Sequence, residues 1–103
     1  MNIHELKNFN TLPLSVRVLL TLISLADEQG KIRTTLPDLV RYLGASRQSV
    51  SSHIKNFVNV GALKWRYSGS ARLNPLFYYT GNPSELNNVA KEFEQFKSDM
   101  KAE

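Results

Sequence analysis

Residues 47–59 carry short polar side chains that can hydrogen bond to the edges of nucleotide bases. On a helical wheel Val50, Ile54 and Phe57 form an apolar side, and the polar residues lie opposite or beside it. Short polar side chains let a helix sit deep in the major groove, and the Gln48 amide can pair with adenine through two hydrogen bonds. The residues of this segment that we expect to contact DNA are Arg47, Gln48, Ser49, Ser51, Ser52, Lys55 and Asn56.

Three of these residues, Arg47, Ser51 and Lys55, are better placed for phosphates than for base edges. The alternative interpretation is an ordinary solvated helix face, which typically carries pairs of Glu and Lys. No acidic residue occurs from residue 39 to residue 79. This absence of acid favours the DNA-binding interpretation.

Basic residues also mark a predicted β-hairpin. Residues 63–67 alternate apolar and basic side chains, which predicts a half-buried strand with Lys64 and Arg66 on one face. Arg72 follows the turn at residues 68–70, where the wing of a DNA-binding domain reaches a minor groove or its phosphates. We therefore add Lys64, Arg66 and Arg72 to the predicted DNA-binding residues, with simple solubility as the alternative for Lys64.

Four aromatic residues, Trp65, Tyr67, Phe77 and Tyr79, lie in or after this hairpin. They are a potential stacking platform for single-stranded nucleic acid. Aromatic residues that alternate with basic ones on a strand more often belong to the core, and that is the interpretation we favour.

The sequence lacks the residue patterns that metal binding, nucleophilic catalysis and phosphate-binding loops require. The chain has no cysteine, and its two histidines, His4 and His53, have no metal-binding spacing. Ser52 and His53 are adjacent in a helix and point apart, which is poor geometry for a nucleophile and its base. No glycine-rich phosphate-binding loop is present. We expect no enzyme activity, no metal and no cofactor.

The length and the charge distribution of the chain indicate how many domains it forms and what kind of ligand it binds. The 103 residues allow one domain, and the formal net charge is +4. Residues 31–80 contain eight basic residues and one acid, whereas residues 84–103 contain three basic and five acidic residues. A basic middle indicates a polyanion-binding surface. With no signal-peptide pattern and no long apolar stretch, the expected location is the cytoplasm, at the nucleoid or a plasmid, without membrane contact.

Helical periodicity predicts the elements that carry the sites. We expect a helix over 14–27, a short extended piece over 31–33, and two short helices over 36–43 and 46–60. Thr35 and Ser46 are the predicted caps of the two short helices, and Gly44 permits the sharp turn between them. Strands are predicted over 63–67 and 71–74, followed by an extended segment over 76–79. The order is that of a helix-turn-helix followed by a wing.

A last helix is predicted over 82–101, capped by Asn82 with Pro83 in its first turn. Its apolar residues are spaced 3, 4, 3, 4, which is a two-heptad seam. We expect this helix and a short amphipathic segment over 3–9 to form a homodimer, with packing of the stripe on its own domain as the alternative. The predicted interface residues are Ile3, Leu6, Leu86, Val89, Phe93, Phe96 and Met100.

Residues 39–54, with the sequence LVRYLGASRQSVSSHI, resemble the helix-turn-helix of bacterial winged-helix regulators of the ArsR and MarR kinds. The resemblance extends over about residues 14–80. It implies an α+β, mostly helical winged helix-turn-helix with a two-stranded wing, in a dimer on a pseudo-palindromic DNA site. The ArsR metal clusters are missing here, and MarR proteins are longer, so metal or ligand sensing is not implied.

Residues 73–75 and 81–82 are similar to the segment after the wing in plasmid replication proteins of the RepL kind, and the size and layout are similar to TubR plasmid partition proteins. The prediction is a single domain, 1–103, with a DNA-binding body over 1–81. We expect sequence-specific duplex binding by a homodimer that regulates transcription or maintains a plasmid or phage. The alternatives are a protein-interaction winged helix and a single-strand or RNA-binding protein.

Overall fold

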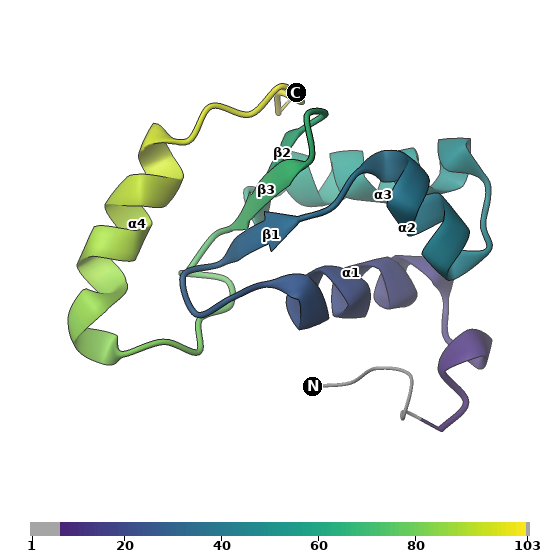
Figure 1. Cartoon of the computed structure of the whole chain (residues 1–103), viewed down its shortest axis with the longest axis horizontal. Coiled ribbons are helices and arrows are strands. Elements are labelled where there is room, and N and C mark those ends of the chain that lie inside the picture. Colours follow the sequence, from purple (N-terminus) through teal and green to yellow (C-terminus); the bar gives the residue numbers. More distant parts are fainter. Residues whose placement is uncertain (1–6, 103) are drawn as a thin grey trace.

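The computed structural model describes residues 7–102, so the predicted contacts of Ile3 and Leu6 lie outside the described part. About half of these residues are helical, and the class is α+β. The element order is consistent with a winged-helix-like layout (Figure 1). The elements are η2 (Phe9–Thr11), α1 (Leu14–Leu25), β1 (Lys31–Arg33), α2 (Leu36–Leu43), α3 (Arg47–Asn59), β2 (Leu63–Arg66), β3 (Ser70–Leu73), η3 (Pro83–Glu85) and α4 (Leu86–Gln95).

The sheet has three antiparallel strands in the order β1-β3-β2. The predicted hairpin is confirmed: Trp65 lies opposite Ala71, and Arg66 opposite Ser70. The prediction of a two-stranded wing was incomplete, because β1 pairs with the other side of β3 through Ile32 and Ala71. A strand of three residues has too short an alternation pattern for the sequence alone to assign its partner.

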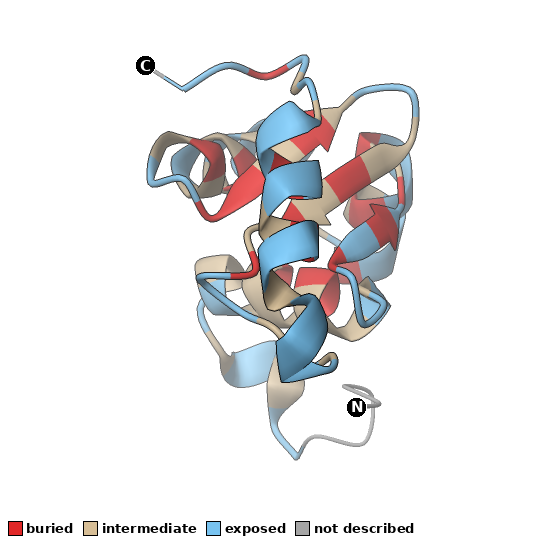
Figure 2. Cartoon of the chain, turned by 90° about the vertical axis from the view of Figure 1, so that its left-hand side faces the viewer, coloured by how far each residue is buried: buried red, intermediate tan, exposed pale blue. Residues whose placement is uncertain are grey.

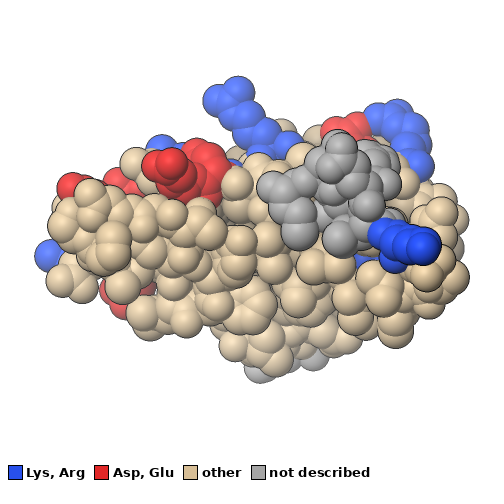
Figure 3. Space-filling model, turned by 90° about the horizontal axis from the view of Figure 1, so that it is seen from below, with Lys and Arg blue, Asp and Glu red and all other residues tan. Residues whose placement is uncertain are grey.

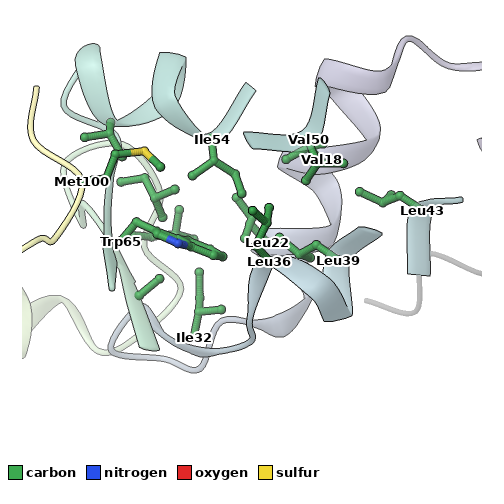
Figure 4. Packing of buried hydrophobic residues seen from close by; sticks show 14 residues of the cluster. Val18, Leu22, Ile32, Leu36, Leu39, Leu43, Val50, Ile54, Trp65 and Met100 are labelled. Carbon is green, nitrogen blue, oxygen red and sulfur yellow. The ribbon is translucent and has the colours of Figure 1, made fainter. Parts of the chain in front are cut away.

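Alternation along the hairpin sends one set of side chains into the core. Leu63, Trp65, Ala71 and Leu73 are each about 1% exposed and face α1, α2 and α3. Figure 4 shows Trp65 and Ile32 from the sheet facing Leu22, Ile54 and their neighbours on the helices. The other set, Lys64, Arg66 and Arg72, therefore occupies the outer face of the sheet.

Local signals fix the turn between α2 and α3 as predicted. The Thr35 hydroxyl accepts a hydrogen bond from the Asp38 amide at 3.3 Å, and Gly44 has a φ of 62°, in the left-handed region that favours glycine. The Ser46 hydroxyl accepts from the Ser49 amide at 3.2 Å. Arg17 of α1 donates to the Leu43 carbonyl at 3.3 Å, so the end of α2 is held against α1.

The predicted C-terminal helix over 82–101 is wrong in extent. A 3-10 turn precedes α4, and the helix ends at Gln95, where Phe96 turns to extended backbone. The chain leaves the helix because residues 98–100 hydrogen bond to the open edge of β2. The Trp65 amide donates to the Ser98 hydroxyl at 2.9 Å, and the Asp99 amide donates to the Trp65 carbonyl at 2.8 Å.

The five apolar residues predicted to form a two-heptad dimer seam therefore do not lie on one helix. Phe96 and Met100 lie beyond α4, and Met100 is part of the chain's own core cluster. Val89 and Phe93 are 4% and 8% exposed within the single chain. Only Leu86 and Phe96 of the described stripe keep intermediate exposure. Dimerisation itself stays a prediction, but this stripe is not the exposed seam that it requires.

Helix α4 and the segment after it cover the outer face of the hairpin. Figure 1 places α4 at the left of the sheet, and Figure 2, seen from that side, shows it in front of the strands. The sheet thus lies between the α1–α3 core and α4. Among residues 7–102, no helix has the length and apolar character that a membrane crossing requires.

The aromatic residues do not all belong to the core. Trp65 is 1% exposed, as predicted, but Tyr67 is 58% and Phe77 is 47% exposed. The segment over 76–79 is not extended, because the amides of Phe77 and Tyr78 both donate to the Asn74 carbonyl and close a turn. Tyr67 and Phe77 lie at opposite ends of β3, which is incompatible with one continuous stacking platform.

Candidate nucleic-acid interface

Helix α3 separates an anchored side from an open side. Val50 and Ile54 are fully buried and Val58 is 4% exposed, against α1, α2 and β2. The predicted contact residues lie on the other side. Arg47, Gln48, Ser49, Ser52 and Asn56 are exposed, and Ser51 and Lys55 are partly exposed.

The first turn of α3 is held by its cap and leaves two long side chains outside it. The Ser46 hydroxyl donates to the Ser49 hydroxyl at 2.8 Å and accepts from the Ser49 amide. The hydroxyl of Ser49 is therefore engaged in the cap. Arg47 and Gln48 extend from the same turn into solvent, and the positive end of the helix dipole lies there as well.

Helix α3 carries two cations, Arg47 and Lys55, and no acidic residue. The acid nearest to α3 in sequence, Asp38, forms an ion pair with Arg41 on the surface of α2. Hydrogen bonding with Thr35, together with the Arg41 guanidinium, lowers the pKa of Asp38 below its usual value of 3.8. Figure 3, which views the molecule from below, shows acidic side chains mainly at its left and basic side chains at its top and right.

The hairpin cations have partners inside the chain. The Lys64 ammonium donates to the carbonyls of Phe93 and Glu94 at 2.7 and 3.1 Å, at the end of α4. The Arg66 Nε donates to the Lys97 carbonyl at 2.7 Å. These contacts hold both cations against the C-terminal segment.

Arg72 is held by the same cover. Its guanidinium lies 3.5 Å from the Glu92 carboxylate and 5.2 Å from the centre of the Phe96 ring. The Arg66 guanidinium stacks on the same ring at 4.0 Å. Three of the ten predicted DNA-binding residues, Lys64, Arg66 and Arg72, are thus brought together with α4 and not with the outer face of α3.

The tip of the hairpin exposes an aromatic side chain that the sequence did not predict to be exposed. Tyr67 was interpreted as core, yet its side chain is exposed where β2 turns into β3. Its amide donates to the Asp99 carboxylate at 3.1 Å, which fixes the backbone of the tip. The available signal was the position of Tyr67 two residues before Gly69, inside the turn rather than in the strand.

Within residues 7–102, no cluster of three or more His, Cys, Asp or Glu side chains is able to hold a metal ion. A cavity of about 330 Å³ lies between the end of α3 and the C-terminal segment. Its lining is mostly apolar and includes Val58, Leu63, Phe93, Phe96 and Met100.

No protein-family model, no curated protein and no solved structure matches the chain. Function is therefore inferred from the surface of α3, the distribution of charge and the order of the elements.

Proposed function

We propose that the chain binds duplex DNA as a homodimer, with the first turns of α3 in the major groove. The observation that carries the proposal is the outer face of α3: it is polar, free of acid and open, while Val50, Ile54 and Val58 anchor the opposite side. A helix that reads the major groove needs an exposed polar side and a buried anchoring side, because its side chains discriminate between bases only when the helix is held rigidly.

The arrangement of elements supports a winged-helix assignment. The helix pair α2–α3 has a three-residue turn and is followed by the hairpin β2–β3, with β1 completing the sheet. This is the order that the ArsR and MarR resemblance implies. In this arrangement the hairpin contacts DNA through its tip at Tyr67 and Ser68, and not through Lys64, Arg66 and Arg72.

Individual roles follow from side-chain chemistry. Gln48 reads an adenine, and Arg47, Ser51 and Lys55 contact phosphates. Ser52 and Asn56 lie further along the same face, where short side chains allow close approach. Lys64, Arg66 and Arg72 are left out of the interface, because each already holds a partner on the C-terminal segment.

The proposed role is transcriptional regulation or plasmid or phage maintenance, and the layout of the binding site distinguishes the two. A single palindrome indicates a repressor, and a tandem array indicates partition or replication. Selection of bound sequences from random duplex DNA, followed by footprinting, provides the test. Enrichment of a defined motif supports the proposal. Preferential binding of single-stranded DNA or RNA in competition with duplex would contradict it.

A further inference from the structure

Within residues 7–102, the two most exposed large apolar side chains are Leu76 in the turn after β3, at 80%, and Val60 at the end of α3, at 76%. Phe77, beside Leu76, is 47% exposed. Hydrogen bonds bring these two segments together. The Asn74 amide donates to the Ala62 carbonyl at 2.8 Å, and the Asn74 side chain donates to the Gly61 carbonyl at 3.0 Å.

The turn that presents Leu76 is well held. Its amide donates to the Asn74 side-chain oxygen at 2.9 Å, and the Phe77 amide donates to the Asn74 carbonyl at 2.9 Å. Pro75 is buried beneath the turn. The apolar side chains are thus displayed by a fixed backbone, which lowers the entropy cost of a contact made there.

Charge is absent from both segments. Residues 56–63 and 73–84 contain no Lys, Arg, Asp or Glu. A partner with a strong charge of either sign finds nothing to match on this patch, defined by Val60, Leu76, Phe77 and Tyr78. A neutral apolar patch can meet its own copy across a two-fold axis without repulsion, whereas the basic face of α3 cannot.

We propose that this patch joins two copies of the chain, an inference that rests on the proposed DNA binding for its purpose. The patch lies at the C-terminal end of α3, so the copies meet tail to tail and the first turns of both helices point outward.

The size of the patch defines the strength of the pairing. Four exposed apolar side chains present a few hundred Å², the scale of a functional patch on a small protein. One partner of a standard interface buries about 800 Å², so the patch forms the centre and neighbouring polar residues form the rim. The pairing is consequently weak in solution and stronger when two half-sites on DNA hold both copies together.

The test is Leu76→Glu, which places a charge at the centre of the patch without disturbing the core. The matched control is Leu25→Glu, because Leu25 is a leucine of 45% exposure at the end of α1. Circular dichroism checks the fold of each variant. Sedimentation velocity over a range of concentrations then measures the self-association of the protein alone.

We expect the wild type and Leu25→Glu to associate with increasing concentration, and Leu76→Glu to weaken this association by at least ~tenfold. Association of Leu76→Glu equal to the wild type, or a wild type that stays monomeric at all concentrations, overturns the proposal. Neither measurement contains DNA. A negative result therefore rejects the proposed contact between copies and leaves duplex binding by α3 to be tested separately. On selected DNA, Leu76→Glu is expected to keep single half-site affinity and to lose cooperativity between two half-sites.

Discussion

Two basic surfaces of this chain, the outer face of α3 and the outer face of the hairpin, look alike in sequence and differ in the folded molecule. Both combine Lys or Arg with polar neighbours, and both lie within a stretch free of acid. On α3 the side chains of Arg47 and Gln48 are exposed, and those of Ser51 and Lys55 are partly exposed. On the hairpin Lys64, Arg66 and Arg72 are held by carbonyl groups, a carboxylate and an aromatic ring of the C-terminal segment. The sequence shows where the basic residues lie on each element. Whether they can reach a ligand depends on the segments that pack over them in the fold.

Removing the Ser98 hydroxyl, which hydrogen bonds to both the amide and the carbonyl of Trp65, is expected to have the largest effect on stability. Ser98→Ala leaves the Trp65 amide, buried under the segment, without its acceptor. An unsatisfied buried amide costs about 1–3 kcal/mol, which lowers the Tm of a domain of this size by roughly 5–15 °C. Thermal unfolding followed by circular dichroism measures the change, with Ser52→Ala as the exposed-serine control. Equal Tm values for the two variants would show that the segment does not hold β2.

The open surface is probed by Arg47→Ala. Each phosphate contact adds about 0.9 to the slope of log affinity against log salt, so this variant is expected to make the slope shallower by about one. Lys91→Ala removes an exposed cation from α4 and is expected to leave the slope unchanged. The measurement is fluorescence anisotropy on duplex DNA across a salt series. A shallower slope for Lys91→Ala but not for Arg47→Ala would show that the DNA contacts α4 instead of α3.

The covered surface is probed by Arg72→Gln. This change removes a partly exposed ion pair with Glu92, which costs at most ~1 kcal/mol. Because the cation is not in the proposed interface, duplex affinity is expected to stay within about twofold of the wild type, after folding has been checked. A tenfold loss of affinity with an intact fold would return the hairpin face to the interface.

The smallest effect concerns pH. The pKa of Asp38 is lowered in the fold, so its ionised form contributes stability at pH values above 3.8, and that contribution is lost as the pH falls through the lower folded value. Asp38→Asn removes this contribution at neutral pH. The difference in Tm between the wild type and Asp38→Asn is expected to be small at neutral pH and to vanish well below pH 3.8. A difference that grows on acidification would contradict this assignment.

The elements that the sequence predicted correctly are those fixed by neighbouring residues. The cap at Thr35, the left-handed Gly44 and the cap at Ser46 delimit α2 and α3 through contacts three or four residues apart. The alternating residues 63–66 give β2 directly, because alternation is the local signature of a strand.

The errors arise where distant segments compete. The 3-4 spacing continues to Met100, yet the chain leaves the helix after Gln95 because Ser98 and Asp99 bond to the open edge of β2. This competition joins residues more than thirty positions apart, and no local pattern encodes it. Contacts with residues 92–97, also distant in sequence, removed the cations Lys64, Arg66 and Arg72 from the predicted interface.

The most direct test of the account is the effect of Gln48→Ala on sequence discrimination. The affinities of the wild type, Gln48→Ala and the exposed-glutamine control Gln95→Ala are measured for the selected duplex and for random duplex. The account predicts that Gln48→Ala loses about 1–3 kcal/mol on the selected site and little on random DNA, while Gln95→Ala matches the wild type on both. An undiminished preference of Gln48→Ala for the selected site would contradict the claim that the first turn of α3 reads the DNA.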